Sequence, residues 1–224
     1  MIGRLMTAVA ALGAILVRVI RALDRWGGFS SRRGEGAYAR CVPWIAGPLH
    51  RRIVADTVAR FGDQPGAMIV DLGSGPGSLA LELAQRLPRA QITGVEPNGR
   101  MRAIASLERG DRANVRFVDG TAERIPFPDR SVDLVVSSLS AHHWEDLDAA
   151  VREIRRILRP GGAAWIHDIR FATFTGTEID AVRRRLGLPA GSIRRSVPEG
   201  QGRLSLAARI DIDPDPDRAI EVAV

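Results

Sequence analysis

Residues 69–80, IVDLGSGPGSLA, join three local signals that together dictate one kind of supersecondary unit. A short β-branched run ends in the carboxylate of Asp71, and glycines follow at alternate positions, Gly73, Gly75 and Gly77. Leucines spaced four residues apart then predict a helix. A glycine turn lets the backbone approach a ligand closely, and a helix N-terminus presents N–H groups without partners. The segment therefore predicts a nucleoside-type cofactor site.

Strand and helix signals alternate along the rest of the chain. Strands are predicted over residues 67–71, 91–96, 115–119, 132–137 and 163–169. Helices are predicted over residues 48–61, 78–87, 98–109, 146–158 and 177–186, with Asn98 and Asp146 as N-caps. A hairpin is predicted from residues 192–197 and 203–212. The alternation indicates an α/β fold with a mostly parallel sheet, helices on both faces and an antiparallel C-terminal hairpin.

The length of 224 residues fits one domain with an appendage. We divide the chain into an amphipathic N-terminal helix (1–25), a linker or flap rich in Gly and Arg (26–47), the main domain (48–212) and a frayed C-terminal tail (213–224). One cysteine, Cys41, excludes an internal disulfide, and no Cys/His group has the spacing of a zinc site. We therefore expect a cytoplasmic protein without a structural metal.

Positive charge is concentrated at the N-terminus. Residues 1–33 carry six arginines against Asp24 alone, which accounts for +5 of the net +6. On a helical wheel, arginines occupy one side of this segment and Leu, Val and Ile the other, as in a helix lying at the cytoplasmic membrane surface. Packing on the domain or on a partner and a secretory signal are the alternatives. The uncharged stretch 5–17 is shorter than the roughly 20 residues that span a bilayer.

The glycine turn itself narrows the class of ligand. The third glycine stands at position 77, whereas the dinucleotide fingerprint would place it at position 78, which is serine. No Gly-Lys-Ser/Thr follows, and all 32 basic residues of the chain are arginine, so a phosphate-binding P-loop is excluded. A carboxylate just before the turn disfavours a pyrophosphate and favours a ligand that carries an ammonium or sulfonium group.

Two further carboxylates follow the neighbouring strands. Glu96 ends the second predicted strand, where an acidic side chain can accept both hydroxyls of a ribose. Asp119 ends the third, where a carboxylate or a backbone amide can contact an adenine. Since the carboxyl ends of parallel strands meet at one sheet edge, Asp71, Glu96 and Asp119 are expected to converge. Each of them could instead only cap the helix that follows it.

These motifs together resemble the class I S-adenosylmethionine-dependent methyltransferases of the small-molecule and lipid type, a group that includes the ubiquinone/menaquinone-biosynthesis methyltransferases. The matching stretches are VDLGSGPGSLALELA (70–84), ITGVEPN (92–98), residues 115–144 and REIRRILRPGG (152–162). The resemblance implies a Rossmann-like seven-stranded sheet. It also implies S-adenosyl-L-methionine as cofactor and S-adenosyl-L-homocysteine as product.

The resemblance also assigns roles to individual residues. Asp71, Gly73, Ser74, Gly75 and Gly77 would surround the methionine portion and Glu96 would hold the ribose. The adenine would be bordered by Pro97, Asn98, Met101, Asp119, Gly120, Thr121 and Ala122. Ser137 and Ser138 would line the channel toward the methyl group.

The base that removes a proton from the acceptor is expected just past the fourth strand. His142 and His143 lie there, and His143, followed by Trp144, is the preferred candidate. His167 and Asp168 form a second candidate pair; either pair could serve packing or capping alone. An amine acceptor would need no base.

The predicted function is methyl transfer to a small-molecule or lipidic acceptor at the membrane surface. The alternatives are a non-catalytic S-adenosylmethionine-binding scaffold protein, or an RNA or protein methyltransferase. Ser137–Ser140 stand where many adenine-methylating enzymes carry Asn/Asp-Pro-Pro-Tyr/Phe, which makes nucleic acid the less favoured substrate. The acceptor, its methylated atom and the oligomeric state stay open at this point.

Overall fold

The computed structural model describes residues 32–62, 64–169, 174–196 and 207–214, with side chains of the first helix from residue 46 onward. The predicted N-terminal helix (1–25), the first part of the predicted linker (26–31) and most of the C-terminal tail (215–224) lie outside the described residues. The turn of the predicted hairpin, residues 197–206, also lies outside them.

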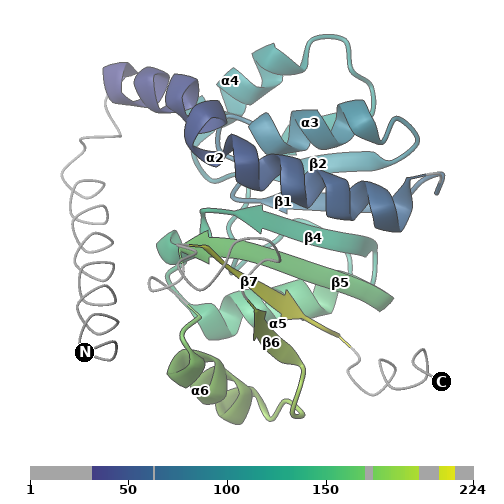
Figure 1. The fold of residues 1–224 in the computed structure, drawn as a ribbon, viewed down its shortest axis with the longest axis vertical. Helices are drawn as coiled ribbons and strands as arrows, with labels where there is room; N and C mark the ends of the chain where they lie inside the picture. The colour runs from purple at the N-terminus through teal and green to yellow at the C-terminus, as the bar shows by residue number, and fades with distance from the viewer. Residues whose placement is uncertain (1–31, 63, 170–173, 197–206, 215–224) are drawn as a thin grey trace.

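The described strands form one seven-stranded sheet of order β3-β2-β1-β4-β5-β7-β6 (Figure 1). Their bounds are β1 Met68–Leu72, β2 Gln91–Val95, β3 Val115–Val118, β4 Val132–Ser138, β5 Leu158–Ile169, β6 Ile193–Ser196 and β7 Ala207–Ile212. Strands β1 to β5 pair in parallel, whereas β7 lies antiparallel between β5 and β6. The predicted mixed sheet with its antiparallel C-terminal pair is confirmed.

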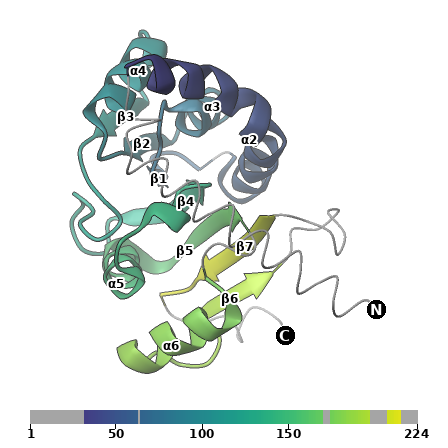
Figure 2. The ribbon, with the colours of Figure 1, turned by 90° about the vertical axis from the view of Figure 1, so that its left-hand side faces the viewer.

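Helices cover both faces of this sheet. Their bounds are α2 Arg32–Phe61, α3 Ser78–Arg86, α4 Gly99–Arg109, the 3-10 turn η1 Ala141–His143, α5 Leu147–Ile157 and α6 Gly176–Leu186. Figure 2 shows α2, α3 and α4 on one side and α5 and α6 on the other. No helix among the described residues combines the length and the apolar character needed to cross a bilayer.

Alternation along the central strands divides the core into two layers. Ile69 and Leu134 pack against α2 and α3, whereas Val70 and Val135 pack against α5 and α6. All four side chains are fully buried. Both faces of the central strands are apolar for this reason, as the continuous hydrophobic runs of the sequence predict.

The predicted N-caps of α4 and α5 are confirmed by their hydrogen bonds. The side chain of Asn98 accepts hydrogen bonds from Arg100 N and Met101 N, and that of Asp146 accepts from Asp148 N and Ala149 N. Short polar side chains at these positions satisfy N–H groups that have no partner within the helix.

The start of the first described helix differs from the prediction. Residues 26–47 are predicted as a linker or flap and the helix from residue 48, but α2 already begins at Arg32. The second half of α2 is anchored in the core by Ile53, Val54 and Phe61. Once a packed segment has nucleated a helix, each further residue that is fixed adds one hydrogen bond, without the cost of a new nucleus. Such propagation overrides the Gly and Pro signals on which the linker prediction depends.

The start of β5 also differs from the prediction. Pro160-Gly161-Gly162 are expected to separate α5 from a strand at residue 163, but β5 begins at Leu158. Its pairing with β4 shifts register, from Val132↔Leu158 to Leu134↔Ala163, so the intervening residues form an irregularity within the ladder.

Candidate active site

The candidate site lies at the carboxyl ends of β1, β2 and β4. Strand β1 has β2 on one side and β4 on the other. From β1 the chain first builds the sheet outward through β2 and β3, and then returns to continue it on the other side of β1 with β4 and β5. Parallel sheets bind their ligands in the crevice at such a switch point. The glycine turn that follows β1 lies at this switch point.

The three glycines of the turn all have positive φ, of 74°, 53° and 87° at Gly73, Gly75 and Gly77. A Cβ atom at position 77 would lie 2.7 Å from Phe117 Cζ and 2.8 Å from Ala105 Cβ, so this glycine is required by packing. A Cβ atom at position 75 would meet nothing within 4 Å. The turn is therefore packed against the protein at Gly77 and open at Gly75.

Glu96 joins this turn to the loop after β2. One of its carboxylate oxygens accepts a hydrogen bond from Gly75 N at 2.9 Å and the other from Asn98 N at 2.9 Å. Its burial raises the pKa of the carboxyl, and these two backbone bonds and the charge of Arg102 oppose the rise. Each carboxylate oxygen has two lone-pair sites, so Glu96 retains capacity for two further hydroxyl donors.

Asp71 is 1% exposed and faces the first turn of α3. Burial raises the pKa of its carboxyl to about 7, against a hydrogen bond from the Ala80 N–H, and the charge of Glu96 raises it further. Its Oδ2 atom has no hydrogen-bond partner among the described residues. One side of this carboxylate thus serves the N-terminus of α3, the capping alternative considered for the sequence.

Asp119 lies further out, with its side chain 75% exposed, and pairs with Arg102 at 2.6 Å. Arg102 also donates to the carbonyl oxygen of Glu96 at 2.5 Å. Arg102 is not among the residues that the sequence motifs predict for the site, although its position one helical turn after Asn98 directs it back toward the strand ends. Asp71 and Glu96 are thus buried and electrostatically coupled, whereas Asp119 lies at the exposed rim.

The remaining residues predicted to contact the cofactor differ in their exposure and in their contacts within the protein. Asn98 caps α4, Pro97 and Thr121 are exposed, and Met101 and Ala122 are buried at 7% and 4% exposure. A Cβ atom at Gly120 would lie 2.8 Å from both Pro126 Cδ and Val95 Cγ1. Ser74 is buried, and its Oγ atom has no hydrogen-bond partner among the described residues.

The two serines that end β4 have different environments. Ser137 is fully buried, and its hydroxyl shares a 2.7 Å hydrogen bond with that of Ser140, which in turn contacts the carbonyl oxygen of Leu72 at 3.0 Å. Ser138 Oγ is buried and has no partner among the described residues. Ser137 therefore serves the internal network between β4 and the glycine turn, which leaves Ser138 as the serine with unused bonding capacity.

His142 and Asp168, which the sequence analysis assigns to separate candidate pairs, form one buried pair. His142 Nδ1 lies 2.8 Å from Asp168 Oδ1, and the backbone N–H of His142 donates to Oδ2 at 2.8 Å. Asp168 is fully buried and His142 is 4% exposed. The preferred candidate, His143, is exposed, and its ring lies 4.0 Å from that of His142. The carboxylate thus orients His142 and not His143.

His167 lies on the opposite face of β5. Successive side chains of a strand point to opposite faces, so His167 shares its face with Trp165, toward α2, while Asp168 faces α5 and α6. Burial, together with the charges of Arg209 and Arg52, lowers the pKa of His167 to about 4. A neutral imidazole on this face does not join the pair of His142 and Asp168.

No group of three or more metal-ligating side chains occurs among the described residues. The donor set at the strand ends consists of carboxylates, backbone N–H groups and one imidazole. This set suits an organic ligand with hydroxyl groups and positive charge.

Comparisons with known proteins agree with this geometry. A family model described as a methyltransferase domain matches residues 70–166. The chain is 35% identical over 127 residues to a ubiquinone/menaquinone biosynthesis C-methyltransferase of Caulobacter vibrioides, covering 53% of this chain and 50% of that protein. It is 39% identical over 98 residues to a demethylmenaquinone methyltransferase of Chlorobaculum tepidum, covering 44% and 39%. The chain thus spans about half the length, or less, of the curated relatives it matches.

The fold has counterparts among solved structures. A Methanococcus maripaludis protein described as an S-adenosyl-L-methionine-dependent methyltransferase superposes with a TM-score of 0.67 at 22% identity, covering 82% of this chain and 93% of that one. The C-methyltransferase domain of the citrinin polyketide synthase gives a TM-score of 0.67 at 16% identity, covering 83% and 58%. The glycine turn and the acidic ends of β1, β2 and β3 fall within residues 70–166. Residues 70–166 are therefore similar to a methyltransferase domain in sequence, and the described sheet shares the fold of S-adenosylmethionine-dependent methyltransferases.

Proposed function

We propose that this chain transfers a methyl group from S-adenosyl-L-methionine to a small-molecule acceptor of the quinone type. The observation that carries the proposal is the combination, at one sheet edge, of an open glycine turn beside Glu96 and a buried pair of His142 and Asp168. The first part supports cofactor binding and the second supports proton removal.

The residues at the strand ends fit the cofactor that the family implies. The open side of Gly75 leaves room for the backbone to approach a ligand, and Glu96 retains two lone-pair sites suited to ribose hydroxyls. Asp119 and Ala122 border the adenine side, and no basic side chain lies in the turn itself. An acidic site of this kind suits a positively charged adenosyl compound better than a pyrophosphate.

The chemistry divides between the cofactor and the chain. When bound, S-adenosyl-L-methionine supplies a methyl group already activated on a sulfonium. An acceptor would supply the electron pair for the new bond to that methyl group. The chain orients the two reactants and excludes water.

His142 takes the proton that an acceptor O–H or acidic C–H must lose. Asp168 binds Nδ1 and the backbone N–H of the same residue, so it fixes the ring orientation and stabilises the imidazolium that forms. With the Nδ1 proton directed at Asp168, the lone pair on Nε2 is the basic site. This assignment replaces His143 as the preferred base.

The acceptor class comes from the relatives, whose names associate them with ubiquinone and menaquinone biosynthesis and with demethylmenaquinone. A reduced quinone carries ring hydroxyls whose deprotonation activates the ring carbon or the oxygen itself. Such an acceptor has the proton that a His–Asp pair is suited to remove.

Two measurements test the proposal. Calorimetric titration should show binding of S-adenosyl-L-methionine, and transfer of labelled methyl should be observed to reduced demethylmenaquinone or to a component of a lipid extract. Binding without transfer to any fraction would favour the scaffold alternative. Transfer to RNA or protein, with none to the lipid extract, would contradict the acceptor class.

A further part of the proposal concerns residues 1–25, which would hold the enzyme at a membrane surface where lipidic acceptors reside. Its support is the arrangement of arginines and aliphatic residues on opposite sides of the predicted helix. Flotation with anionic liposomes should be strong for the full chain and weak for a variant that lacks residues 1–25. Equal flotation of the two would contradict membrane binding through this segment.

A further inference from the structure

The segment that joins β3 to β4, residues 119–131, runs from the adenine side of the candidate site to α5. We refer to it as the β3–β4 segment. Its first residues include Thr121 and Ala122, which border the proposed adenine position. Its later residues contact the C-terminal half of α5, whose N-terminus follows the loop that carries His142.

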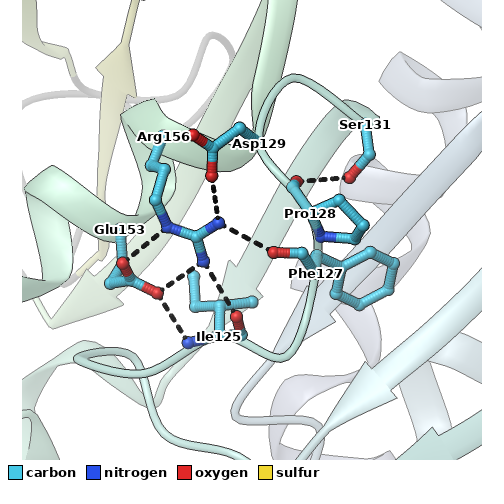
Figure 3. A network of polar contacts seen from close by, with 7 residues as sticks. All are labelled: Ile125, Phe127, Pro128, Asp129, Ser131, Glu153 and Arg156. Atoms are coloured by element: carbon cyan, nitrogen blue, oxygen red, sulfur yellow. Dashed lines mark hydrogen bonds and ion pairs between the residues drawn. The ribbon is translucent and has the colours of Figure 1, made fainter.

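Arg156 and Glu153 of α5 hold the later part of the β3–β4 segment (Figure 3). The guanidinium of Arg156 donates to both carboxylate oxygens of Glu153, at 2.7 and 2.8 Å, and to Asp129 at 2.7 Å. It also donates to the carbonyl oxygens of Phe127 and Ile125, at 2.8 and 3.0 Å. Glu153 in turn accepts a hydrogen bond from Ile125 N at 3.0 Å. These charge-assisted bonds fix the segment to α5.

Glu123 makes a second connection at the other end of the same helix. Its Oε1 atom accepts hydrogen bonds from Glu145 N at 2.9 Å and from Asp146 N at 3.4 Å. Glu123 lies in a tight turn closed by reciprocal backbone bonds between Thr121 and Arg124, both 3.3 Å. The carboxylate therefore links the adenine side of the site to the end of the loop that carries His142.

These contacts form a closed frame. From Glu123 the path runs to Asp146, along α5 to Glu153 and Arg156, across to Ile125 and back to Glu123. A displacement of the turn at residues 121–124 must therefore move the loop at residues 141–146 or break a charge-assisted bond. The proposed adenine contacts lie next to this frame, and the proposed base lies in the loop that ends at it.

We propose that Glu123 is a positioning residue that, when the adenosyl group binds, shifts the loop carrying His142 and so changes the surroundings of the His142–Asp168 pair. The proposal rests on the function proposed above, since it assumes that the adenosyl group contacts Thr121 and Ala122. It goes beyond that function by assigning a coupling between the cofactor side and the acceptor side of the site.

The frame allows Glu123 to be removed without dismantling its neighbours. Asp146 caps α5 through its own contacts with Asp148 N and Ala149 N, so the helix start does not depend on Glu123. The Arg156 network holds the rest of the β3–β4 segment. Loss of the Glu123 carboxylate should therefore loosen the end of the loop at residues 145–146, while Asp168 still holds His142.

The experiment uses the full chain with isotopically labelled histidine and S-adenosyl-L-homocysteine as the ligand. The chain has four histidines, so the ring signals of His142 can be assigned by its substitution. Glu123→Ala removes the acceptor, and Glu123→Gln keeps a carbonyl oxygen that can accept both N–H groups. Glu145→Ala is the matched control, because it removes an exposed carboxylate from the same loop and keeps the backbone donors.

Ligand addition should shift the His142 ring signals in the wild type, in Glu123→Gln and in Glu145→Ala. In Glu123→Ala the shift should be lost, while the ligand affinity from calorimetry stays within about threefold. Two results would overturn the coupling. One is a shift of the His142 ring signals in Glu123→Ala as large as that in the wild type, and the other is a loss of this shift in Glu145→Ala.

Failure of the proposed function gives a different result. If neither the wild type nor any variant binds S-adenosyl-L-homocysteine, the cofactor assignment is wrong. The positioning role is then tested by comparing the His142 ring signals of the ligand-free proteins. Glu123→Ala should change the His142 ring signals and Glu123→Gln should restore them. Identical His142 signals in all ligand-free variants would overturn the positioning role.

Discussion

Replacement of Gly77 by alanine is expected to destabilise the fold strongly, whereas the same replacement of Gly75 should destabilise it less and also weaken ligand binding. At Gly77, φ is +87°, and left-handed backbone costs a residue with a Cβ atom about 1–2 kcal/mol. The new methyl group would also lie 2.7 Å from Phe117 and 2.8 Å from Ala105, and overpacking of this kind costs about 1–3 kcal/mol. The free energy of unfolding should therefore fall by about 2–5 kcal/mol.

At Gly75 only the backbone contribution applies. Its φ is +53° and nothing lies within 4 Å of the new Cβ atom, so the free energy of unfolding should fall by about 1–2 kcal/mol. The methyl group would instead occupy the open side of the turn. If ligand atoms must shift to avoid it, a cost of about 1–3 kcal/mol corresponds to a loss of affinity of about 5- to 150-fold.

Gly187→Ala provides the matched control. Gly187 ends α6 with φ +62°, and a Cβ atom there also meets nothing within 4 Å. It should cost the same backbone strain as Gly75→Ala and leave ligand affinity unchanged. Urea unfolding measures the stability of all three variants, and calorimetric titration with S-adenosyl-L-methionine measures affinity. Wild-type affinity in Gly75→Ala would refute the placement of the ligand, and wild-type stability in Gly77→Ala would refute the packing argument.

Three further predictions follow from single side chains. His142→Gln should lower turnover by about 100-fold or more at unchanged cofactor affinity, and His143→Gln by less than about tenfold; the reverse ranking in a labelled-methyl assay would return the base role to His143. Because the folded state raises the pKa of Asp71 to about 7, this group's contribution to stability is lost as pH rises from about 4 to about 7. Asp71→Asn should therefore gain stability relative to the wild type across that range, and a pH-independent difference in urea unfolding would count against the buried carboxyl. Arg156→Ala should cost about 2 kcal/mol, because it leaves buried acceptors without a donor, whereas the exposed Arg152→Ala should change stability by less than about 0.5 kcal/mol; equal losses would show that the network contributes nothing.

Local signals predicted most of the fold. Helix caps such as Asn98 and Asp146 act within three residues of the sequence, and the apolar runs of the strands reflect burial on both faces. The predicted starts of α2 and β5 are wrong, because the positions where these elements begin depend on tertiary contacts. Packing of Ile53 and Phe61 extends α2, and pairing with β4 extends β5 through a Pro-Gly-Gly segment.

The candidate site was predicted in part. Motif spacing placed Asp71 and Glu96 at adjacent strand ends, because parallel strands end at one edge. The pairing of His142 with Asp168 could not be predicted, since it depends on the register of Ser138 opposite His167 and on the alternation of β5. Glu123 and Arg102 were missed because their partners include backbone atoms, which no side-chain motif marks.

The position of β7 between β5 and β6 has a consequence for the newly made chain. On the ribosome β6 is completed before β7, yet among the described strands β6 pairs with β7 alone. The hydrogen-bonding edge of β5 therefore stays open until residues 207–212 emerge, and β6 cannot dock before then. A nascent chain stalled before this point exposes an unpaired strand edge that other chains can join.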